Sequence, residues 1–490
     1  GSRWIVTLYL HLLHWKTFLL LRDGYDALAR FISPSSPVDT HATMMEKLAR
    51  GQIVPLESPR YRSALSAFEG NLSDLRLLCE KKGIPLILST QVSNLRNQPP
   101  FVSGEPPGKS LEQRDAFRNR FALGIRERAE GEADSALQTF RTLLSEDSLR
   151  ADTHFEIARC LDTLGRPHEA EAEYVRARDL DELRFRTSSD FNNVIRTMAD
   201  GHGTSVVDME DTFRTHSPDS LIGNDFIVEH LHPNSRGSFL MAKAFAEAMM
   251  ARRLLADEQT WRTHDTVSDS RLWELRPVTA LDERIVDRSR EVLISGWPFT
   301  DHVPVVPAIP QNDTLGQIAE KFTRGVWTWA RAHEAAATTY ETRGERTNEE
   351  KELRALVWME PFEPGAYLQL ARLYVKEGRP ADVRSTLLAS VSAEPTAAAC
   401  HLLADLSLQN GNPVEAISWF TKAASLPMTA AERVNTSFGL ALACLRANLT
   451  GECMQHLQEV LSLDPGHAQA RNLLEALRNN PRQSAPSPHR

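Results

Sequence analysis

The clearest pattern along the chain is a repeated pair of apolar segments separated by a short polar turn. Each unit has a segment rich in small residues, then a glycine and a few polar residues, then a second apolar segment that ends at proline or an acidic residue. The turn glycines Gly344, Gly378 and Gly411 lie 34 and 33 positions apart. Apolar residues at helical spacing on both sides of such a turn predict antiparallel helix pairs, because glycine tolerates the positive φ that ends a helix.

A fourth unit, LALACLRANLTGECMQHLQEVLSLDPGHA, keeps the pattern after a longer preceding segment. Residues 468–477 then predict a closing helix. The period and the small residues resemble the tetratricopeptide family over about 335–478. The resemblance implies an α-solenoid over 318–478 with a groove that binds a protein partner. Each hairpin leaves an apolar face that its neighbour must cover, and small residues such as Ala416 and Ala423 allow the close approach.

An isolated earlier pair has the same period. Gly131 and Gly165 lie 34 positions apart, within hairpins over 118–182. Two hairpins alone are short for an independent solenoid, so we expect this pair to pack on the surrounding α/β segments as an insertion.

Two short apolar runs flank the earlier pair, over 83–90 and 203–208, and each follows a predicted helix and a turn glycine. This order is typical of a parallel α/β sheet. Ligands in such sheets bind beyond the carboxyl ends of the strands, where Asn94 and Asp208 fall. We nevertheless interpret Asn94 as a turn residue and Asp208 as a helix cap or loop anchor.

The sharpest local motif is Glu229-His-Leu-His232-Pro-Asn, followed by Gly237 and a predicted helix over 238–255. It resembles the last signature block of SGNH (GDSL-type) ester hydrolases, D-x-x-H-P-N-x-x-G. The order of parts over about 60–250 is also similar to a subgroup in which tetratricopeptide hairpins interrupt the hydrolase domain. The resemblance implies a partial flavodoxin-like parallel sheet, His232 as general base, Glu229 as the acid that orients it, and an acyl or O-acetyl ester substrate.

An acid and a histidine three residues apart can share a hydrogen bond, which fixes the tautomer and stabilises the imidazolium formed when the base accepts a proton. Glu229 stands where the family has Asp, so the extra methylene either reaches the ring or misplaces it. His230 is interpreted as a structural or surface neighbour. The alternative for His232 is a histidine at a capped helix start.

The family's other blocks have no counterpart here. No G-D-S precedes His232, and Gly223-Asn224-Asp225 imitates the third block in letters only, because it starts six residues before Glu229. Two accounts compete: an N-terminally incomplete esterase, which the opening Gly-Ser favours, or a degenerate hydrolase fold used as a platform. For the residues given we expect no serine-dependent catalysis, since the nucleophile and oxyanion donors are missing.

Composition and charge exclude further classes of function. The chain has 490 residues, which predicts two or more domains, and a formal net charge of -9 without a dominant basic cluster, so no nucleic-acid partner is expected. The cysteines are scattered and predict core residues without a disulfide framework or a zinc site. No glycine-rich loop supports nucleotide binding, and no cofactor or metal is expected. The five cysteines are Cys79, Cys160, Cys400, Cys444 and Cys453.

The apolar run from Trp4 to Leu21 is interrupted by His11, His14 and Lys16, so it predicts a buried or interfacial amphipathic helix and not a membrane span. Residues 257–312 contain three tryptophans and several prolines, and we interpret them as an extended connector whose tryptophans are packing anchors. A helix over 318–337 is expected to lead into the repeats.

The fold class is thus α/β plus all-α. The working hypothesis is an SGNH-family ester hydrolase whose repeats recruit a protein partner, and the alternative is a non-catalytic tetratricopeptide scaffold or adaptor. The compartment stays open, with an extracytoplasmic or membrane-anchored full-length protein among the options. The predicted parts are 1–117 (α/β), 118–182 (inserted pair), 183–256 (α/β with the Glu-x-x-His motif), 257–317 (connector), 318–478 (repeats) and 479–490 (disordered tail).

Overall fold

The computed structural model describes residues 3–32, 49, 51–105, 108–300 and 305–479, and these divide into two compact units. The first unit takes in the residues up to 274 together with 290–306. The second takes in 275–289 and the residues from 307 onward. Of the predicted tail over 479–490, residues 480–490 lie outside the described residues, whereas Asn479 ends the last helix.

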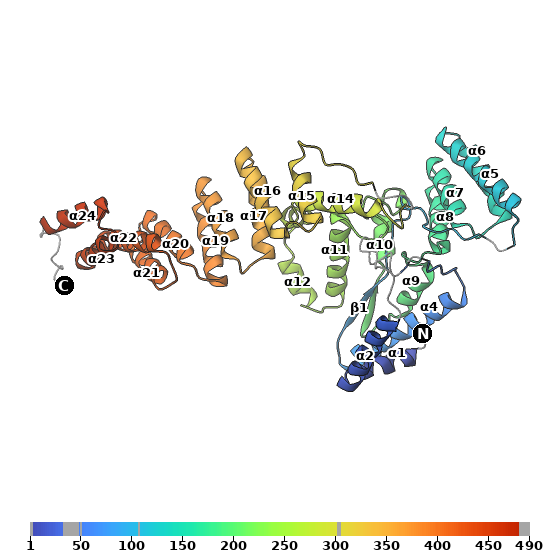
Figure 1. The fold of residues 1–490 in the computed structure, drawn as a ribbon, viewed down its shortest axis with the longest axis horizontal. Coiled ribbons are helices and arrows are strands. Elements are labelled where there is room, and N and C mark those ends of the chain that lie inside the picture. Colours follow the sequence, from blue (N-terminus) through green and yellow to red (C-terminus); the bar gives the residue numbers. More distant parts are fainter. Residues whose placement is uncertain (1–2, 33–48, 50, 106–107, 301–304, 480–490) are drawn as a thin grey trace. The chain divides into compact units, whose positions relative to one another are not determined.

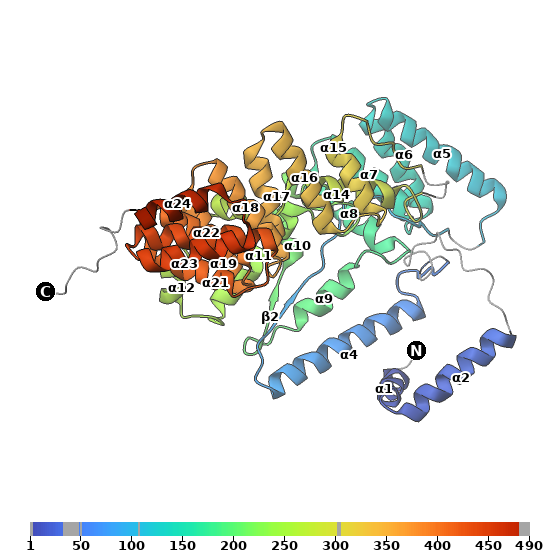
Figure 2. The same ribbon diagram turned by 60° about the vertical axis from the view of Figure 1, so that its left-hand side comes forward.

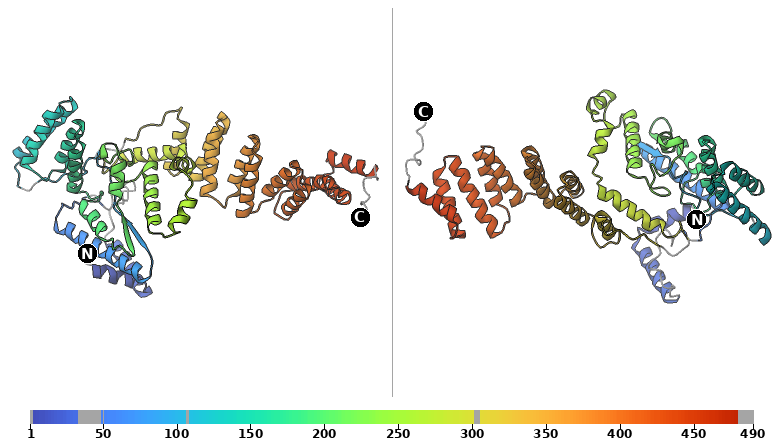
Figure 3. Two further views of the ribbon diagram at one scale, coloured as in Figure 1. Left: turned by 180° about the vertical axis from the view of Figure 1, so that it is seen from behind. Right: turned by 90° about the horizontal axis from the view of Figure 1, so that it is seen from above.

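The second unit is a row of helix pairs, seen in orange and red in Figures 1 and 3. Four hairpins, α16–α17, α18–α19, α20–α21 and α22–α23, follow one another, and α24 covers the last. The predicted repeats and closing helix are confirmed. The helices are α14 (Ala280–Ile294, its first part in this unit), α15 (Thr314–Thr323), α16 (Trp329–Arg343), α17 (Arg346–Met359), α18 (Pro364–Lys376), α19 (Pro380–Ala393), α20 (Ala397–Gln409), α21 (Pro413–Ala424), α22 (Ala430–Arg446), α23 (Thr450–Leu463) and α24 (Ala468–Asn479).

The turn glycines have the backbone conformation that the pattern requires. Gly344, Gly378 and Gly411 have φ of 72°, 68° and 76°. In the fourth hairpin the same position is occupied by Asn448 with φ 62°. Asparagine is one of the few residues besides glycine that adopts this left-handed conformation at low cost, so the fourth turn needs no glycine.

The hairpins share their cores with their neighbours. Phe420 on α21 is fully buried, and it packs in one cluster with Leu440 and Ala443 of α22. A Cβ built on Gly439 of α22 would lie 2.4 Å from Cζ of Phe420. Glycine is therefore required at 439 because the phenyl ring occupies the space of a side chain.

A buried polar cluster joins α14 to the first hairpin. His333 of α16 is fully buried, with Nδ1 2.6 Å from Glu352 of α17 and Nε2 3.1 Å from Asp282 of α14. Trp329 also donates from Nε1 to Asp282 at 3.0 Å. Burial opposes the charged ring, yet the two carboxylates raise the pKa of His333 above its ordinary value. Each charge in this cluster thus has a partner of opposite sign, as burial demands.

The prediction of an extended connector over 257–312 was wrong, because this stretch contains α12 (Glu258–His264), α13 (Asp269–Leu275) and α14. The apolar residues Leu281 and Ile285 of α14 pack with Ile318 and Ala319 of α15, and this burial favours helix over extended chain. The predicted helix over 318–337 is two helices, α15 and α16, separated at Gly325 with φ 69°.

Two of the three tryptophans of this stretch pack against aromatic rings, as expected. Trp273 contacts Phe239 edge-on with ring centroids 5.5 Å apart, and Trp297 contacts Phe185 at 5.9 Å. Both contacts lie within the first unit.

The first unit is mainly helical. No single helix covers Trp4 to Leu21, because the chain turns at 13–15 and starts a second helix. In the described part of the chain, no helix is both long and apolar enough to cross a bilayer. The elements are α1 (Arg3–Leu12), α2 (Lys16–Ile32), α4 (Pro59–Lys81), β1 (Leu86–Ser89), α5 (Leu111–Ala129), α6 (Ala133–Glu146), α7 (Ala151–Thr163), α8 (Pro167–Leu180), α9 (Ser189–Thr197), β2 (Thr204–Val207), α10 (Met209–His216), η1 (Pro218–Ser220), α11 (Ser235–Ala251), α12 and α13.

The two predicted strands form and pair in parallel, with Leu86 opposite Thr204 and Ser89 opposite Val207. They are the only strands among the described residues, so the expected flavodoxin-like sheet is reduced to one strand pair in a mostly helical chain. A wider sheet needs further apolar runs between helices, and the remaining apolar residues here lie on helix faces instead. Figure 2 shows α4 alongside α9, with which it is in contact.

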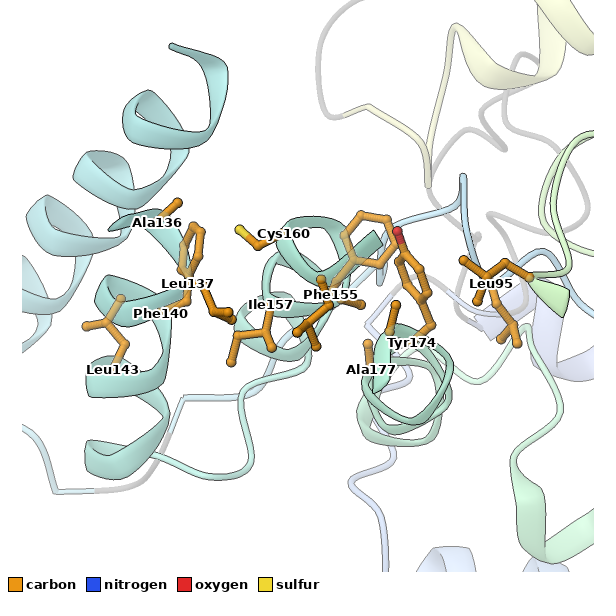
Figure 4. Close-up of a cluster of buried hydrophobic side chains, with 14 of the residues drawn as sticks. Leu95, Ala136, Leu137, Phe140, Leu143, Phe155, Ile157, Cys160, Tyr174 and Ala177 are labelled. Atoms are coloured by element: carbon orange, nitrogen blue, oxygen red, sulfur yellow. The ribbon is translucent and has the colours of Figure 1, made fainter. Parts of the chain in front are cut away.

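The early hairpins α5–α6 and α7–α8 pack on the loop that follows β1, as expected for an insertion. Their core contains Phe140, Ile157 and Tyr174, and it continues to Leu95 of that loop (Figure 4). Two hairpins alone leave an apolar face open, and here the loop covers it. Of the five cysteines, Cys160 is buried in this core, and Cys400, Cys444 and Cys453 are buried in the cores of the C-terminal array, whereas Cys79 is half-buried.

Replacement of Gly439 by alanine tests the close packing of the hairpins. We expect Gly439→Ala to lower the free energy of unfolding by about 1–3 kcal/mol, because the new methyl group overlaps the ring of Phe420. The matched control is Gly451→Ala on α23, where a Cβ meets nothing within 4 Å. Urea unfolding followed by circular dichroism measures both, and equal effects of the two substitutions would contradict the packing argument.

Candidate functional site

The Glu-x-x-His motif forms a closed turn directly before α11. An antiparallel bridge pairs Ile227 with Pro233, and the amide of Val228 donates to the carbonyl of His232 at 2.7 Å. Asn234 caps α11, since its side chain accepts from the amides of Arg236 and Gly237 at 3.0 Å. The turn and the start of α11 thus fix the positions of the motif residues. His232 lies two residues before Asn234, which is the residue that caps the helix.

A steric constraint explains why position 237 is a glycine. A Cβ at this position would lie 2.3 Å from the carbonyl oxygen of Phe226. Only glycine allows the first turn of α11 to approach the strand-like segment so closely.

Glu229 reaches His232 despite its extra methylene. Its Oε1 pairs with Nδ1 of His232 and accepts from the amide of His232 at 3.2 Å. The other oxygen accepts from the amides of His230 and Leu231. The Glu229 side chain is 2% exposed and that of His232 is 65% exposed. Because Nδ1 faces the carboxylate, Nε2 is the ring nitrogen free to meet a substrate or a second side chain.

The surroundings keep Glu229 ionised. Burial alone would raise its pKa, but the hydrogen bond and charge of His230, the amide of Leu231 and the bond to His232 lower the pKa of Glu229 to about 2. A carboxylate that stays charged can orient an imidazole and stabilise its protonated form.

His230 belongs to the interior, so of the two options for this residue the structural one applies. The ring is fully buried, and Phe101, Phe185 and Phe299 contact it edge-on with centroids 5.5, 6.0 and 5.5 Å away. Its Nδ1 pairs with the second oxygen of Glu229. One carboxylate therefore serves two imidazoles, one buried and one exposed.

Asn94 is the residue that holds the turn from the strand side. It is buried, its amide donates to the carbonyl of His230 at 2.9 Å, and Nδ2 donates to the carbonyl of Glu229 at 2.8 Å. Nδ2 also donates to Oδ1 of Asn224, at 2.8 Å. The structure thus brings Asn94 and Asn224 to the motif, although the letters Gly223-Asn224-Asp225 only imitate a family block.

Asp208 does not join this site. It caps α10 by accepting from the amide of Asp211 at 3.2 Å, and it pairs with Arg196 at 2.8 Å. Its hydrogen bond from Thr90, 3.0 Å long, links the ends of the two strands. The interpretation of Asp208 as a cap and loop anchor is confirmed.

Two residues that the sequence did not single out support the site. Arg186 is buried and donates from Nη1 to the carbonyls of Asn94 and Gln98, at 3.1 and 2.8 Å. It pairs with buried Asp181, whose carboxylate also accepts from the amide of Phe101 at 2.9 Å. A single arginine and aspartate have no motif spacing, so only the fold shows this role. Within the described ranges, no group of three or more His, Cys, Asp or Glu is arranged to hold a metal ion.

Comparison with known proteins gives one family match. The tetratricopeptide repeat model matches residues 121–182 and 368–432, which lie in the inserted pair and in the C-terminal array. The chain carries tetratricopeptide repeats. Among curated proteins, no sequence matches it significantly.

Several solved structures are similar to this chain, and the names of some of them identify tetratricopeptide repeat proteins. MamA is 17% identical, covers 30% of this chain and 85% of its own, and has a TM-score of 0.28. YrrB, a TPR protein with an unusual peptide-binding site, is 14% identical, with coverage of 34% and 86% and a TM-score of 0.28. The C-terminal part of a TPR repeat-containing protein from Cytophaga hutchinsonii is 9% identical, with coverage of 72% and 98% and a TM-score of 0.28.

The tetratricopeptide match and the Glu229–His232 turn concern different residues. The segment 183–256 lies outside the matched ranges. The expected SGNH hydrolase domain gains no support from the comparisons, and the catalytic roles of Glu229 and His232 stay predictions.

The depressed pKa of Glu229 predicts an acid-dependent contribution to stability. A group whose folded pKa lies below its ordinary value stabilises the fold above that ordinary value, and the contribution is lost as the pH falls toward about 2. Between pH 5 and pH 3 we expect the wild type to lose about 1–2 kcal/mol more unfolding free energy than Glu229→Gln. Urea unfolding at the two pH values measures this, with exposed Glu247→Gln as control; a Glu229→Gln profile parallel to that of the wild type would contradict the pairing.

Proposed function

We propose that the chain is an interaction scaffold whose C-terminal tetratricopeptide repeats bind an extended segment of a protein partner. The observation that carries the proposal is the arrangement of the hairpins in two rows. The first helices, α16, α18, α20 and α22, form one row, and the second helices form the other.

Specific contacts connect neighbours within each row. Lys376 of α18 pairs with Glu341 of α16 at 2.5 Å, and Nδ1 of His401 on α20 lies 3.2 Å from Oγ1 of Thr436 on α22. Helices α18 and α20 are also in contact. In the second row, Arg384 of α19 pairs with Glu415 of α21 at 2.7 Å. A continuous surface along one row follows, and solenoids of this kind use such surfaces for binding.

Polar side chains of mixed charge are exposed on the first row, together with Val375 of α18. Gln369 and Arg372 on α18 and Gln409 on α20 are exposed, and His401 and Asp405 are half-exposed. Amide side chains both donate and accept hydrogen bonds, so they can pair with the backbone of an extended peptide. This composition favours a polar segment over an apolar helix as the partner.

Two substitutions on the first row test the scaffold proposal. Arrayed extended peptides are screened against the whole chain, and a binder is then titrated by fluorescence polarisation. We expect Gln369→Ala together with Arg372→Ala to weaken binding about tenfold, because both side chains lie on the proposed contact surface. The control is Lys351→Ala, an exposed residue on the second helix α17. Binding of no peptide, or an equal loss in the control, would contradict the proposal.

A second candidate function is favoured by the geometry of one turn. An ionised, buried Glu229 holds Nδ1 of an exposed His232, which is the arrangement of a general base and its orienting acid. In this proposal the residues 1–117 and 183–256 form part of an SGNH-like ester hydrolase that takes acyl or O-acetyl esters, and a serine outside these residues supplies the nucleophile.

Turnover of p-nitrophenyl acetate by the full-length protein tests this second function. We expect His232→Ala to reduce kcat about a hundredfold, because general-base assistance is lost. His264→Ala, at another exposed histidine, controls for reaction of the ester with histidines in general. Unchanged turnover in His232→Ala would rule out the base.

A further inference from the structure

A pocket of about 360 Å³ lies in the first unit and is lined in part by Phe185. Its walls come from the segment before α4, the first turn of α4 and the segment between α8 and α9. The amide of Val54 donates to the carbonyl of Glu182 at 2.9 Å and ties the first and last of these together. The lining residues used below are Gln52, Val54, Arg60, Leu183, Arg184 and Phe185.

Arg184 has a buried donor with nothing to receive it. Nε donates to the carbonyl of Val54 at 2.8 Å, and Nη1 donates to the carbonyl of Asp179 at 2.6 Å. The guanidinium lies over the ring of Tyr61, 5.1 Å from its centroid. Nη2 is buried, and among the described residues it has no hydrogen-bond partner. A buried N–H of a cation without an acceptor costs free energy, so an absent acceptor is indicated.

The charge of Arg184 is also left without a direct counterion. Both of its acceptors are neutral carbonyls, and no carboxylate in the described part of the chain lies within ion-pair distance of it. Burial is the largest influence and lowers the pKa of Arg184 from its ordinary value. Buried Arg178 and Arg186 of the same unit, in contrast, each pair with a carboxylate.

Arg60 gives the pocket a second guanidinium. Its Nη2 donates to the amide oxygen of Gln52 at 2.7 Å, and among the described residues it has no ion pair either. The described lining contains no Asp or Glu. Two arginines that face one pocket without a carboxylate are unexpected in a chain with a net charge of -9, where acidic residues outnumber basic ones.

We infer that this pocket binds an oxyanion, the phosphate or carboxylate group of a small ligand. Guanidinium groups match the oxygens of both anions, and such charge-assisted hydrogen bonds are among the strongest available. Arg184 brings its guanidinium to the wall of the pocket, and the exposed Arg60 brings a second one to the rim. Val54, Leu183 and Phe185 add apolar walls, which fit an apolar stem next to the anionic group.

An oxyanion site is a function beyond the proposed scaffold. It needs no glycine-rich loop, because its cations are two side chains, Arg60 before the inserted hairpins in the sequence and Arg184 after them. It also lies close to the glutamate turn. Phe185 contacts the ring of His230 edge-on at 6.0 Å, and His230 pairs with Glu229. One aromatic ring therefore separates the oxyanion pocket from the buried end of that turn.

Calorimetric titration of the whole chain tests the inference, with inorganic phosphate in one arm and acetate in the other, at constant ionic strength. We expect saturable binding of at least one anion. Arg184→Gln and Arg60→Gln should each weaken it about tenfold, since each removes one charge-assisted interaction. Binding of phosphate alone would identify a phosphate group as the ligand. Binding of both anions would show that the pocket also accepts carboxylates.

The matched control is Arg62→Gln, because Arg62 lies on the same helix as Arg60 but pairs with Glu57 at 3.1 Å. Its affinity should equal that of the wild type. Arg184 also holds two backbone carbonyls, so circular dichroism checks the folding of its variant. If Arg184→Gln is unfolded, Arg60→Gln decides. Binding of neither anion, or an affinity in Arg60→Gln equal to that in Arg62→Gln, would overturn the inference.

Discussion

Each helical hairpin of this protein has an apolar face that only its neighbour can cover, and this constraint governs both units. In the C-terminal array the neighbour is another hairpin, and the fit is close enough that Gly439 must lack a side chain where Phe420 packs. In the inserted pair a similar contact exists, because a Cβ on Gly124 would lie 2.7 Å from Cζ of Phe140. The stability of a repeat thus depends on the face next to it.

The inserted pair has no further hairpin to cover its end, and the loop after β1 takes that place. Leu95 enters the hairpin core, and the next residue toward the strand, Asn94, holds the turn with Glu229 and His232. The same loop is fixed from the other side by Arg186 and Asp181 at the end of α8. The apolar contact and the buried ion pair therefore act on one segment, which connects the insertion to the turn.

The features with a local signal could be predicted from the sequence. The repeats follow from the spacing of glycines such as Gly378, the strands from apolar runs after a helix and a turn, and the pairing of Glu229 with His232 from their separation of three residues. The features that were predicted wrongly or missed depend on tertiary contacts. Helix α14 is flanked by prolines that suggested extended chain, and it is stabilised by Leu281 in a core and by Asp282 beside His333, a residue far along the chain. The support of the turn by Arg186 has no pattern in the sequence for the same reason.

Two arginines that are two residues apart differ in whether the described residues supply a counterion. Arg186 pairs with Asp181 and also donates to backbone carbonyls, so its charge is balanced within the protein. Arg184 is half-exposed and, among the described residues, donates only to carbonyls, beside a pocket that holds a second arginine. Burial opposes part of the Arg184 charge, and a carboxylate beside it would offset that cost. An oxyanion bound in the pocket would supply that negative charge to Arg184 and Arg60 together, whereas the carboxylate of Asp181 already does so for Arg186.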